Sequence, residues 1–277
     1  MKILVTGSEG YIGRKIVKKL SSDHNVFGID IKSGLDVRTC LHPSGSLFDK
    51  YLNIGFDAII HTAATPRIQY SIRNPLETLE NNVVSCSTAL NFCRLSGCKR
   101  FVFSSSSSVK SFMNSPYSMQ KKHSEDECQM YRDLYGIKTF CLRYFNVYSE
   151  FEEYLSHGTL LSVWMNSFKN GKTLEIHGDG LQKRDMVHID DVVLANTIFA
   201  TEKIIDAEII QEIGTGSNIS ILDVYNMFKA HGAKSKYVES RLNDVRESIA
   251  NPSYFEATTS IDCGVREVLE NFFKGLR

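Results

Sequence analysis

The chain has 277 residues, 42% of them hydrophobic, which is the composition of an ordinary globular protein of one or two domains. Its 32 basic and 32 acidic side chains cancel, so no net field attracts nucleic acid or an anionic membrane. The opening apolar run is too short for a signal peptide, and no segment approaches the ~20 apolar residues of a membrane span. We therefore expect a cytoplasmic protein that contacts neither nucleic acid nor membrane.

The seven cysteines are odd in number and contain no Cys-x-x-Cys pair. In a cytoplasmic protein this pattern predicts buried, reduced thiols. The spacing of His61, His177 and His188 fits no metal site, so we expect no bound metal.

In the first half of the chain, short runs rich in β-branched residues alternate with segments of helical period. Strands are predicted at 2–7, 25–30, 56–64 and 99–105, and helices at 10–20 and from about Leu76 to Leu95. This alternation predicts a Rossmann-type, doubly wound parallel sheet with helices on both faces. We expect an α/β protein with this sheet in residues 1–149, a return of the chain to it around 186–216, and a smaller C-terminal α/β substrate domain, mainly in 150–277.

Three glycines follow the first predicted strand and lead into an amphipathic helix. Gly7, Gly10 and Gly13 have the spacing G-x-x-G-x-x-G, which allows backbone amides at a helix amino end to approach a pyrophosphate. The second strand ends in Asp30, where an acid accepts ribose hydroxyls and repels a 2'-phosphate. This pattern favours NAD over NADP, although Lys32 lies nearby.

A run of five serines, residues 104–108, begins where a buried strand is expected to end, so it lies at the ligand-binding edge of the sheet. Tyr117 and Lys121 follow, four residues apart and therefore on one helix face, where the lysine charge lowers the pKa of the phenol. Such a tyrosine acts as a general base. The Tyr-x-x-x-Lys pattern also occurs at Tyr11 and Tyr225, but only Tyr117 follows a strand end that carries serines.

These motifs resemble those of extended short-chain dehydrogenases/reductases, in the nucleotide-sugar epimerase/dehydratase family, and are closest to those of UDP-glucose 4-epimerases. The resemblance runs nearly end to end. It is carried by TGSEGYIG, HTAA, KRFVFSSS, SPYSMQK, LRYFNVY, GDGLQKRDMVHIDDVVLAN, IGTGSNIS and DVRESIANPS, in the family's order.

The resemblance implies roles for individual residues. Those implied to bind NAD are Gly7, Gly10, Tyr11, Ile12, Gly13, Asp30, Asp36, Val37, Ala63, Ser104, Tyr117, Lys121, Tyr144 and Phe145. Ser106, Tyr117 and Lys121 are the implied catalytic residues, with Ser106 placed by counting back from Val109. Ser106, Asn146, Arg184 and Arg246 are implied to bind the nucleotide-sugar, the two arginines through its diphosphate. Asn82 is implied to be structural, and Arg143 and Arg241 match no site position, so we expect surface salt bridges there.

The serine run also discriminates among the reactions of the family. In the resembling dehydratases and decarboxylases a carboxylate follows the catalytic hydroxyl, and in GDP-fucose synthases a cysteine stands at the position of Ser108. Here Ser107 and Ser108 stand at these positions. The resemblance therefore implies C4 epimerisation of a UDP-hexose through a 4-keto intermediate, with NAD retained. A reductase of nucleotide-4-keto-sugars that uses NAD(P)H and a non-catalytic dinucleotide-binding regulator remain alternatives.

Two departures from the family stand out. Only ten residues separate Ser106 from Tyr117, where related epimerases have a longer loop, and SEFEEY follows NVY in place of Gly-Pro-Arg. The helix near 76–95 and the helix after Tyr117 resemble those that pair in family dimers, which implies a homodimer.

Overall fold

The computed structural model describes residues 1–150, 159–204 and 207–276. The chain forms two compact units: Met1–Arg143 with Val193–Gln211, and Tyr144–Val192 with Glu212–Arg277. Most of the acidic segment that follows NVY lies at 151–158, outside the described residues. None of the described helices is both long and apolar enough to cross a membrane.

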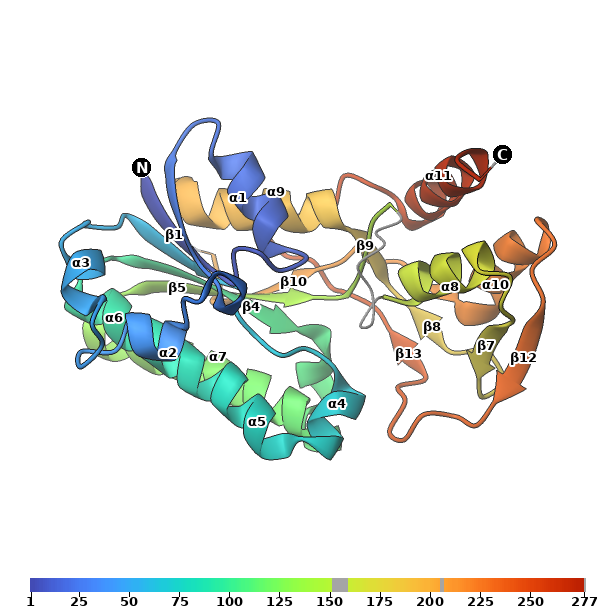
Figure 1. The fold of residues 1–277 in the computed structure, drawn as a ribbon, viewed down its shortest axis with the longest axis horizontal. Coiled ribbons are helices and arrows are strands. Elements are labelled where there is room, and N and C mark those ends of the chain that lie inside the picture. The colour runs from blue at the N-terminus through green and yellow to red at the C-terminus, as the bar shows by residue number, and fades with distance from the viewer. Residues whose placement is uncertain (151–158, 205–206, 277) are drawn as a thin grey trace. The chain divides into compact units, whose positions relative to one another are not determined.

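A six-stranded sheet forms the centre of the first unit (Figure 1). Its order is β10-β5-β4-β3-β1-β2, with bounds Lys2–Thr6 for β1, Asn25–Ile29 for β2, Ala58–His61 for β3, Arg100–Ser106 for β4, Lys138–Tyr144 for β5 and Ile210–Ile213 for β10. β1 pairs in parallel with β2 and β3, and β3 pairs in parallel with β4. The strand order reverses between β1 and β3, and sheets of this kind bind ligands beyond the carboxyl ends of the strands at such a point.

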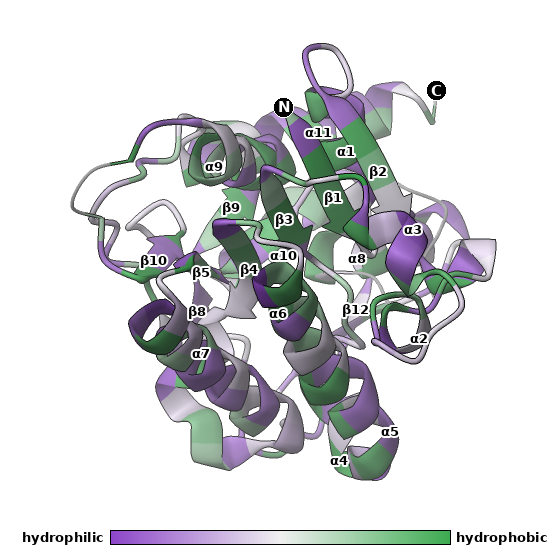
Figure 2. Cartoon of the chain, turned by 90° about the vertical axis from the view of Figure 1, so that its left-hand side faces the viewer, coloured by the Kyte–Doolittle hydropathy of each residue, from purple (hydrophilic) through white to green (hydrophobic). Residues whose placement is uncertain are grey.

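Helices cover both faces of this sheet, with α1 and α9 on one face and α6 and α7 on the other (Figures 1 and 2). The helical segments are α1 Gly13–Leu20, η1 Ile31–Ser33, α2 Val37–Cys40, α3 Phe48–Leu52, α4 Ile68–Arg73, α5 Pro75–Leu79, η2 Glu80–Val84, α6 Ser85–Leu95, η3 Ser107–Asn114, α7 Pro116–Tyr135 and α9 Ile189–Thr201. The long helix predicted at 76–95 is present as α5, a π-helical turn (η2) and α6.

The core of the first unit lies between the sheet and α6, where the strands contribute unbroken apolar runs. All four residues of β3 are buried. The ring of Phe92 packs edge to face against Phe48 and Phe56, with centroids 5.8 and 6.2 Å apart. The predicted buried thiols are found at Cys40, Cys86, Cys93, Cys98, Cys128 and Cys141.

The second unit combines three small sheets with three helices. β8 (Lys183–Arg184) lies between β11 (Ile219–Ser220) and β13 (Glu247–Ser248), β7 (Leu174–His177) pairs with β12 (Ser235–Val238), and β6 (Asn146–Tyr148) pairs with β9 (Met186–His188). The helices are α8 Leu160–Lys169, α10 Ile221–Lys229 and α11 Ile261–Lys274. Their apolar faces meet in an aromatic core in which the ring of Phe228 lies 5.8 Å from Trp164 and 5.7 Å from Phe273.

One thiol differs from the prediction. Cys263 is exposed. It lies on α11, which buries Ile261, Val265 and Val268 at helical spacing and turns the opposite side, with Cys263, toward solvent.

Candidate functional site

The glycine loop connects β1 to α1. Gly7 has φ of 68°, a conformation that strains residues with a side chain, and its N–H donates to a carbonyl at the end of β2 over 2.8 Å. A Cβ atom on Gly13 would lie 2.0 Å from the carbonyl oxygen of Gly7. Gly10, Tyr11 and Ile12 lead into α1, which begins without a side-chain cap. The loop thus keeps backbone amides close to a helix amino end, an arrangement that accepts a pyrophosphate.

Asp30 lies at the end of β2 and fastens this loop to the sheet. Its carboxylate is buried and accepts the backbone N–H of Glu9 and that of Lys32, each over 2.9 Å. The Lys32 ammonium donates to the carbonyl of Glu9 over 3.1 Å. Asp30 therefore stands beside the glycine loop, as the sequence predicts for a ribose-binding acid.

Asp36 and Val37 come after β2, and Ala63 comes after β3; these two strands flank β1. The Arg38 guanidinium, 2.6 Å from the carboxylate of Asp36, lowers the pKa of that group by its hydrogen bonds and its charge, against an opposing effect of burial. Val37 is buried. The backbone N–H of Ala63 donates to Thr6 Oγ1 at the end of β1 over 3.4 Å.

The serine run is not a linker. Ser104, Ser105 and Ser106 are the last residues of β4, and Ser107 and Ser108 open η3. Ser106 Oγ accepts the N–H of Ser108 over 3.2 Å and its hydroxyl over 3.0 Å. Ser106 is therefore presented at the carboxyl end of a central strand, where parallel sheets bind ligands.

Tyr117 lies in the first turn of α7. Its N–H donates to Ser71 Oγ over 3.0 Å, which joins α7 to α4. The Ser106 hydroxyl lies close enough to the phenol of Tyr117 to affect its pKa. Burial raises the pKa of Tyr117, while the hydrogen bond from Ser106 and the positive charge of Arg67 oppose that rise.

Lys121 lies one turn further along α7 and is only 3% exposed. Its Nζ donates to the carbonyl of Ser104 over 2.7 Å and lies 4.7 Å from the centroid of the Phe103 ring and 5.9 Å from that of Tyr117. Burial lowers the pKa of Lys121 to about 8, and nearby thiols and the Glu125 carboxylate oppose that fall. The ionisation of this lysine therefore falls close to neutral pH.

A buried charge network lies behind Lys121. Glu125 accepts the Ser105 hydroxyl over 2.6 Å and two bonds from the Arg143 guanidinium over 2.8 and 2.7 Å. The side chain of Glu125 is 2% exposed and that of Arg143 is 18% exposed. The prediction of a surface salt bridge at Arg143 is therefore wrong, because β5 directs this arginine toward a buried carboxylate on α7.

Asn82 lies in the π-helical turn between α5 and α6 and is buried. Its Oδ1 accepts the N–H of Thr65 over 2.7 Å, and its Nδ2 donates to the Thr65 carbonyl over 3.2 Å and to Gln120 Oε1 over 2.8 Å. These bonds use the whole amide to hold the segment after β3. The contacts match the structural role that the sequence analysis expects.

The remaining predicted residues lie in the second unit. Tyr144 and Phe145 are buried, and Asn146 donates its Nδ2 to the carbonyl of Asp185 over 2.9 Å. Asp185 is itself fully buried and accepts the N–H groups of Thr215, Gly216 and Ala250 over 2.9 to 3.0 Å. The backbone carbonyl of Asp185 thus holds Asn146, and its carboxylate holds the segment after β10 and the segment after β13.

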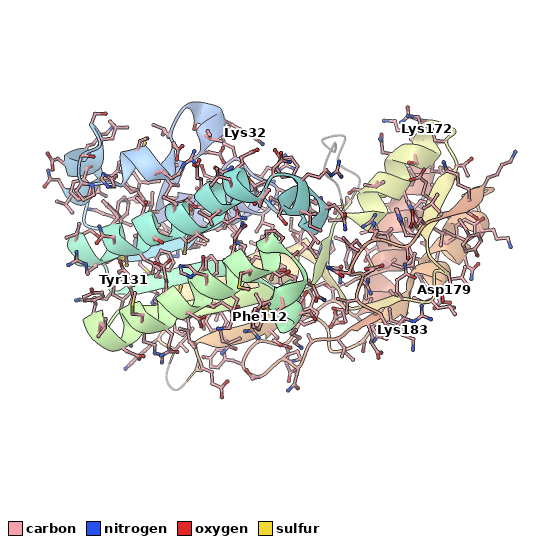
Figure 3. The ribbon with its side chains drawn as sticks, turned by 90° about the horizontal axis from the view of Figure 1, so that it is seen from below. Lys32, Phe112, Tyr131, Lys172, Asp179 and Lys183 are labelled. Carbon is pink, nitrogen blue, oxygen red and sulfur yellow. The ribbon has the colours of Figure 1, made fainter. Side chains whose placement is uncertain are left out.

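Arg184 lies on β8, and Arg246 is the residue before the neighbouring strand β13. Arg184 pairs with Asp244 over 2.6 Å, and Arg246 with Asp179, which lies near Lys183 in Figure 3, over 2.8 Å. Burial lowers the pKa of Arg184, the carboxylate of Asp244 opposes this, and the charge of Arg241 adds to it. Three arginines thus lie in one region of the second unit.

The structure gathers Ser106, Tyr117 and Lys121 within the first unit. The sequence did not predict that Glu125 and Arg67 act near these residues. Nor did it predict that the Ser108 hydroxyl donates a hydrogen bond to Ser106. A signal existed for Glu125, which follows Lys121 by four residues and so shares its helix face. Among the described residues, no three His, Cys, Asp or Glu side chains gather as metal ligands would.

The sheet order and the glycine loop define the first unit as a dinucleotide-binding fold of the Rossmann class. A sequence model of the NAD dependent epimerase/dehydratase family matches residues 3–211. The chain belongs to this family, and the resemblance predicted from its motifs is confirmed.

Individual relatives agree with this assignment. The chain is 30% identical over 253 residues to a putative UDP-glucose 4-epimerase of Methanocaldococcus jannaschii, a match that covers 82% of this chain and 81% of that protein. It is similar to the structure of UDP-glucose 4-epimerase with UDP-glucose from Thermotoga maritima, with a TM-score of 0.85, 25% identity and 100% of both chains covered. It is also similar to MoeE5 in complex with UDP-glucuronic acid and NAD, with a TM-score of 0.82, 25% identity, and 98% of this chain and 99% of that chain covered. The predicted Rossmann-type α/β fold is confirmed.

The buried pair behind Lys121 generates a prediction. Glu125→Gln removes a negative charge that raises the pKa of Lys121, so this lysine will lose its proton at lower pH. It also leaves Arg143 without its carboxylate, which lowers the free energy of unfolding by about 3–5 kcal/mol. We expect the alkaline limb of the pH–activity profile to move to lower pH and the melting temperature to fall.

The matched control is Asp126→Asn, on the same helix, which removes an exposed pair with Lys122. Exposed pairs of this kind contribute ~0.2–1 kcal/mol, so neither quantity should move appreciably. An alkaline limb that stays in place in a folded Glu125→Gln protein contradicts the coupling to Lys121.

Proposed function

We propose that the chain is an NAD-dependent nucleotide-sugar epimerase that interconverts UDP-hexoses at C4 through a transient 4-keto sugar. The observation that carries this proposal is the placement of Ser106 at the end of β4 and of Tyr117 and Lys121 at the start of α7, in a chain of this family whose serine run offers no carboxylate. The Lys121 Nζ joins the two elements through the Ser104 carbonyl. The similar proteins described above are named as UDP-glucose 4-epimerases or bind a UDP-sugar and NAD.

The residues of the first unit fit NAD. A Cβ atom on Gly7 would lie 2.7 Å from the backbone nitrogen of Ala63, so glycine lets the loop stay close to the end of β3. Asp30 stands beside this loop with a carboxylate that suits ribose hydroxyls. In this proposal Asp36 and Val37 border the adenine, and Ala63 and Ser104 line the rest of the cofactor. When bound there, NAD would supply the hydride acceptor and donor for C4 of the sugar.

The chain's own residues handle the proton and the developing carbonyl. Tyr117, as phenolate, takes the proton of the C4 hydroxyl and gives it back when the carbonyl is reduced. Ser106 donates a hydrogen bond to the same oxygen as it becomes a carbonyl. Lys121, in its charged form, holds the nicotinamide ribose and adds positive charge beside the phenol.

The neighbours of Ser106 favour epimerisation over dehydration and decarboxylation. Removal of water or assisted decarboxylation requires another acid or base at the sugar, and Ser107 and Ser108 occupy the positions at which related enzymes supply one. The Ser108 hydroxyl instead donates to Ser106. This bond orients the Ser106 oxygen so that its own proton is available to the phenol or to the sugar.

The second unit is proposed to hold the nucleotide-sugar. Arg184 and Arg246 suit a diphosphate because a guanidinium donates two parallel hydrogen bonds. Each is paired with an aspartate, so binding exchanges a carboxylate partner for a phosphate. Asn146 contacts the sugar nucleotide in this proposal, and Tyr144 and Phe145 border the nicotinamide.

The test is proton NMR of the protein mixed with a panel of UDP-hexoses, first without and then with added NAD. We expect the anomeric signal of the C4 epimer to appear without net formation of NADH, and the responsive hexose identifies the substrate. Tyr117→Phe should lower the rate at least ~100-fold because general base catalysis is lost. Tyr131→Phe, on the same helix, should leave it unchanged.

Full turnover in Tyr117→Phe contradicts the assignment of the base. Conversion of a nucleotide-4-keto-sugar with consumption of NADPH, and no epimerisation of any hexose, identifies a reductase instead. Binding of dinucleotide with neither reaction identifies a regulator.

We further propose that the chain forms a homodimer through α5, α6 and α7. α6 and α7 lie side by side, joined by a hydrogen bond from Ser87 Oγ to the Glu127 carboxylate over 2.7 Å, with Tyr131 toward one end of α7 and Phe112 toward the other (Figure 3). Large apolar side chains exposed on these segments are Leu76, Leu79, Val84, Met119, Met130 and Leu134. Burial of such a surface against a second copy removes apolar area from water.

Light scattering tests the dimer. The native chain should give twice the chain mass, and Leu134→Glu, which places a charge in the contact, should give a monomer with an unchanged circular dichroism spectrum. Leu242→Glu, an exposed leucine of the second unit, is the control and should remain dimeric. A native mass equal to one chain contradicts the proposal.

A further inference from the structure

Arg67 has an unusual backbone conformation. Its φ is 109° and its ψ is 115°, and within the described ranges Asn243, with φ of 57°, is the only other non-glycine residue with positive φ. Such a conformation is costly for a residue with a side chain and persists where the surrounding structure over-determines it. Residues held in this way cluster at functional sites.

Both sides of Arg67 are held by hydrogen bonds. On one side, Asn82 binds both the N–H and the carbonyl of Thr65, over 2.7 and 3.2 Å. On the other, the carbonyl of Arg67 accepts the N–H of Ser71 over 3.0 Å, and Ser71 Oγ accepts the N–H of Tyr117 over 3.0 Å. The strained residue is thus fixed between the π-helical turn and the first turn of α7.

The side chain of Arg67 lies in the surroundings of Tyr117. It is partly buried, and its Nε is shielded from solvent. Its positive charge acts on the phenol of Tyr117 and opposes the rise in the pKa of that group caused by burial. A charge that is partly removed from water acts more strongly on a neighbour than one on the surface.

We propose that Arg67 is a positioning residue for the reaction, a cation on a strained turn that is bonded through Ser71 to the backbone of Tyr117, so that the phenol can release its proton. This inference rests on the proposed function of Tyr117 as the base. The inference also explains the contacts of Asn82, because its amide fixes Thr65, two residues before Arg67.

The other charged groups near the start of α7 have their own contacts. Lys121 on α7 lies over the ring of Tyr117 and donates to the Ser104 carbonyl. Glu77 on α5 accepts the Tyr70 hydroxyl over 2.9 Å, and Lys110 on η3 is exposed. Ser106 at the end of β4 contributes a neutral hydrogen bond. Among the described residues, Arg67 is a cation whose charge acts on the phenol, and Lys121 has its Nζ 5.9 Å from the centroid of the phenol ring.

The test is the titration of Tyr117 by tyrosinate absorbance, with Tyr117→Phe subtracted in each background to isolate this phenol. In Arg67→Met the phenol should ionise about one pH unit higher than in the native protein, and in Arg67→Lys by less. The acidic limb of kcat/KM should move to higher pH by the same amount, because the base form becomes scarcer at each pH. Arg73→Met, at the other end of α4, is the matched control and should change neither.

The strained backbone of Arg67 allows a second measurement, the melting temperature, which does not depend on activity. Arg67→Gly and Arg67→Met both lose the charge, but only glycine adopts φ of 109° without cost. The glycine variant should therefore melt about 2–4 °C above the methionine variant while sharing its shifted titration.

An unchanged titration of Tyr117 in a folded Arg67→Met protein overturns the inference, whatever reaction the chain catalyses. A shifted titration in a protein that epimerises no hexose leaves Arg67 coupled to Tyr117 and rejects the proposed reaction instead. The two failures are therefore distinguishable.

Discussion

The contact on which the site depends is the one between the Lys121 ammonium and the carbonyl of Ser104. It joins the middle of the sheet to α7 and so sets the distance between the end of β4, with Ser106, and the first turn of α7, with Tyr117. A buried ammonium is costly unless it is hydrogen-bonded and compensated. The carbonyl of Ser104 supplies the bond, and the Glu125 carboxylate one turn away supplies part of the compensation, itself fixed by Ser105 and Arg143. Three residues of the serine run therefore face α7. Ser104 contacts Lys121, Ser105 contacts Glu125, and Ser106 lies near Tyr117.

A single phenol receives help from both sides of this arrangement. Ser106 acts on it from the end of β4, and the charge of Arg67 acts from the turn before α4. The Lys121 Nζ lies 5.9 Å from the centroid of the phenol ring. Burial works against ionisation of the phenol, so the neighbours determine whether Tyr117 can act as a base near neutral pH. A site of this kind acts through Ser106, Tyr117 and Lys121, with hydroxyls and no carboxylate at Ser107 and Ser108. The lack of a carboxylate at these two positions agrees with epimerisation better than with dehydration.

Local patterns in the sequence predicted the features that depend on local structure. The glycine spacing, the acid at the end of β2 and the alternation of strands and helices follow from turn geometry and periodicity, and the structure has each of them. The pair Tyr117 and Lys121 was distinguished from two chance repeats by its position after a strand. Tyr225 in the third repeat is buried in the aromatic core of the second unit.

Features that depend on tertiary contacts could not be predicted from local sequence patterns. Arg143 was expected at the surface because nothing local reveals that its partner is a buried glutamate on α7. The positive φ of Arg67 has no signal in residue type, since arginine is a poor choice for that conformation. Cys263 was expected to be buried because sequence alone does not say which face of α11 meets the core.

The most direct test of the account follows the hydrogen at C4. The UDP-hexose that responds in the NMR panel would be prepared with deuterium at C4 and incubated with the protein in ordinary water until half is converted. The account predicts that the C4 epimer keeps its deuterium, because the hydrogen leaves as a hydride and returns within the same site. Loss of deuterium to the solvent would mean that C4 is epimerised by proton abstraction at carbon, and the roles given to Ser106, Tyr117 and NAD would be wrong.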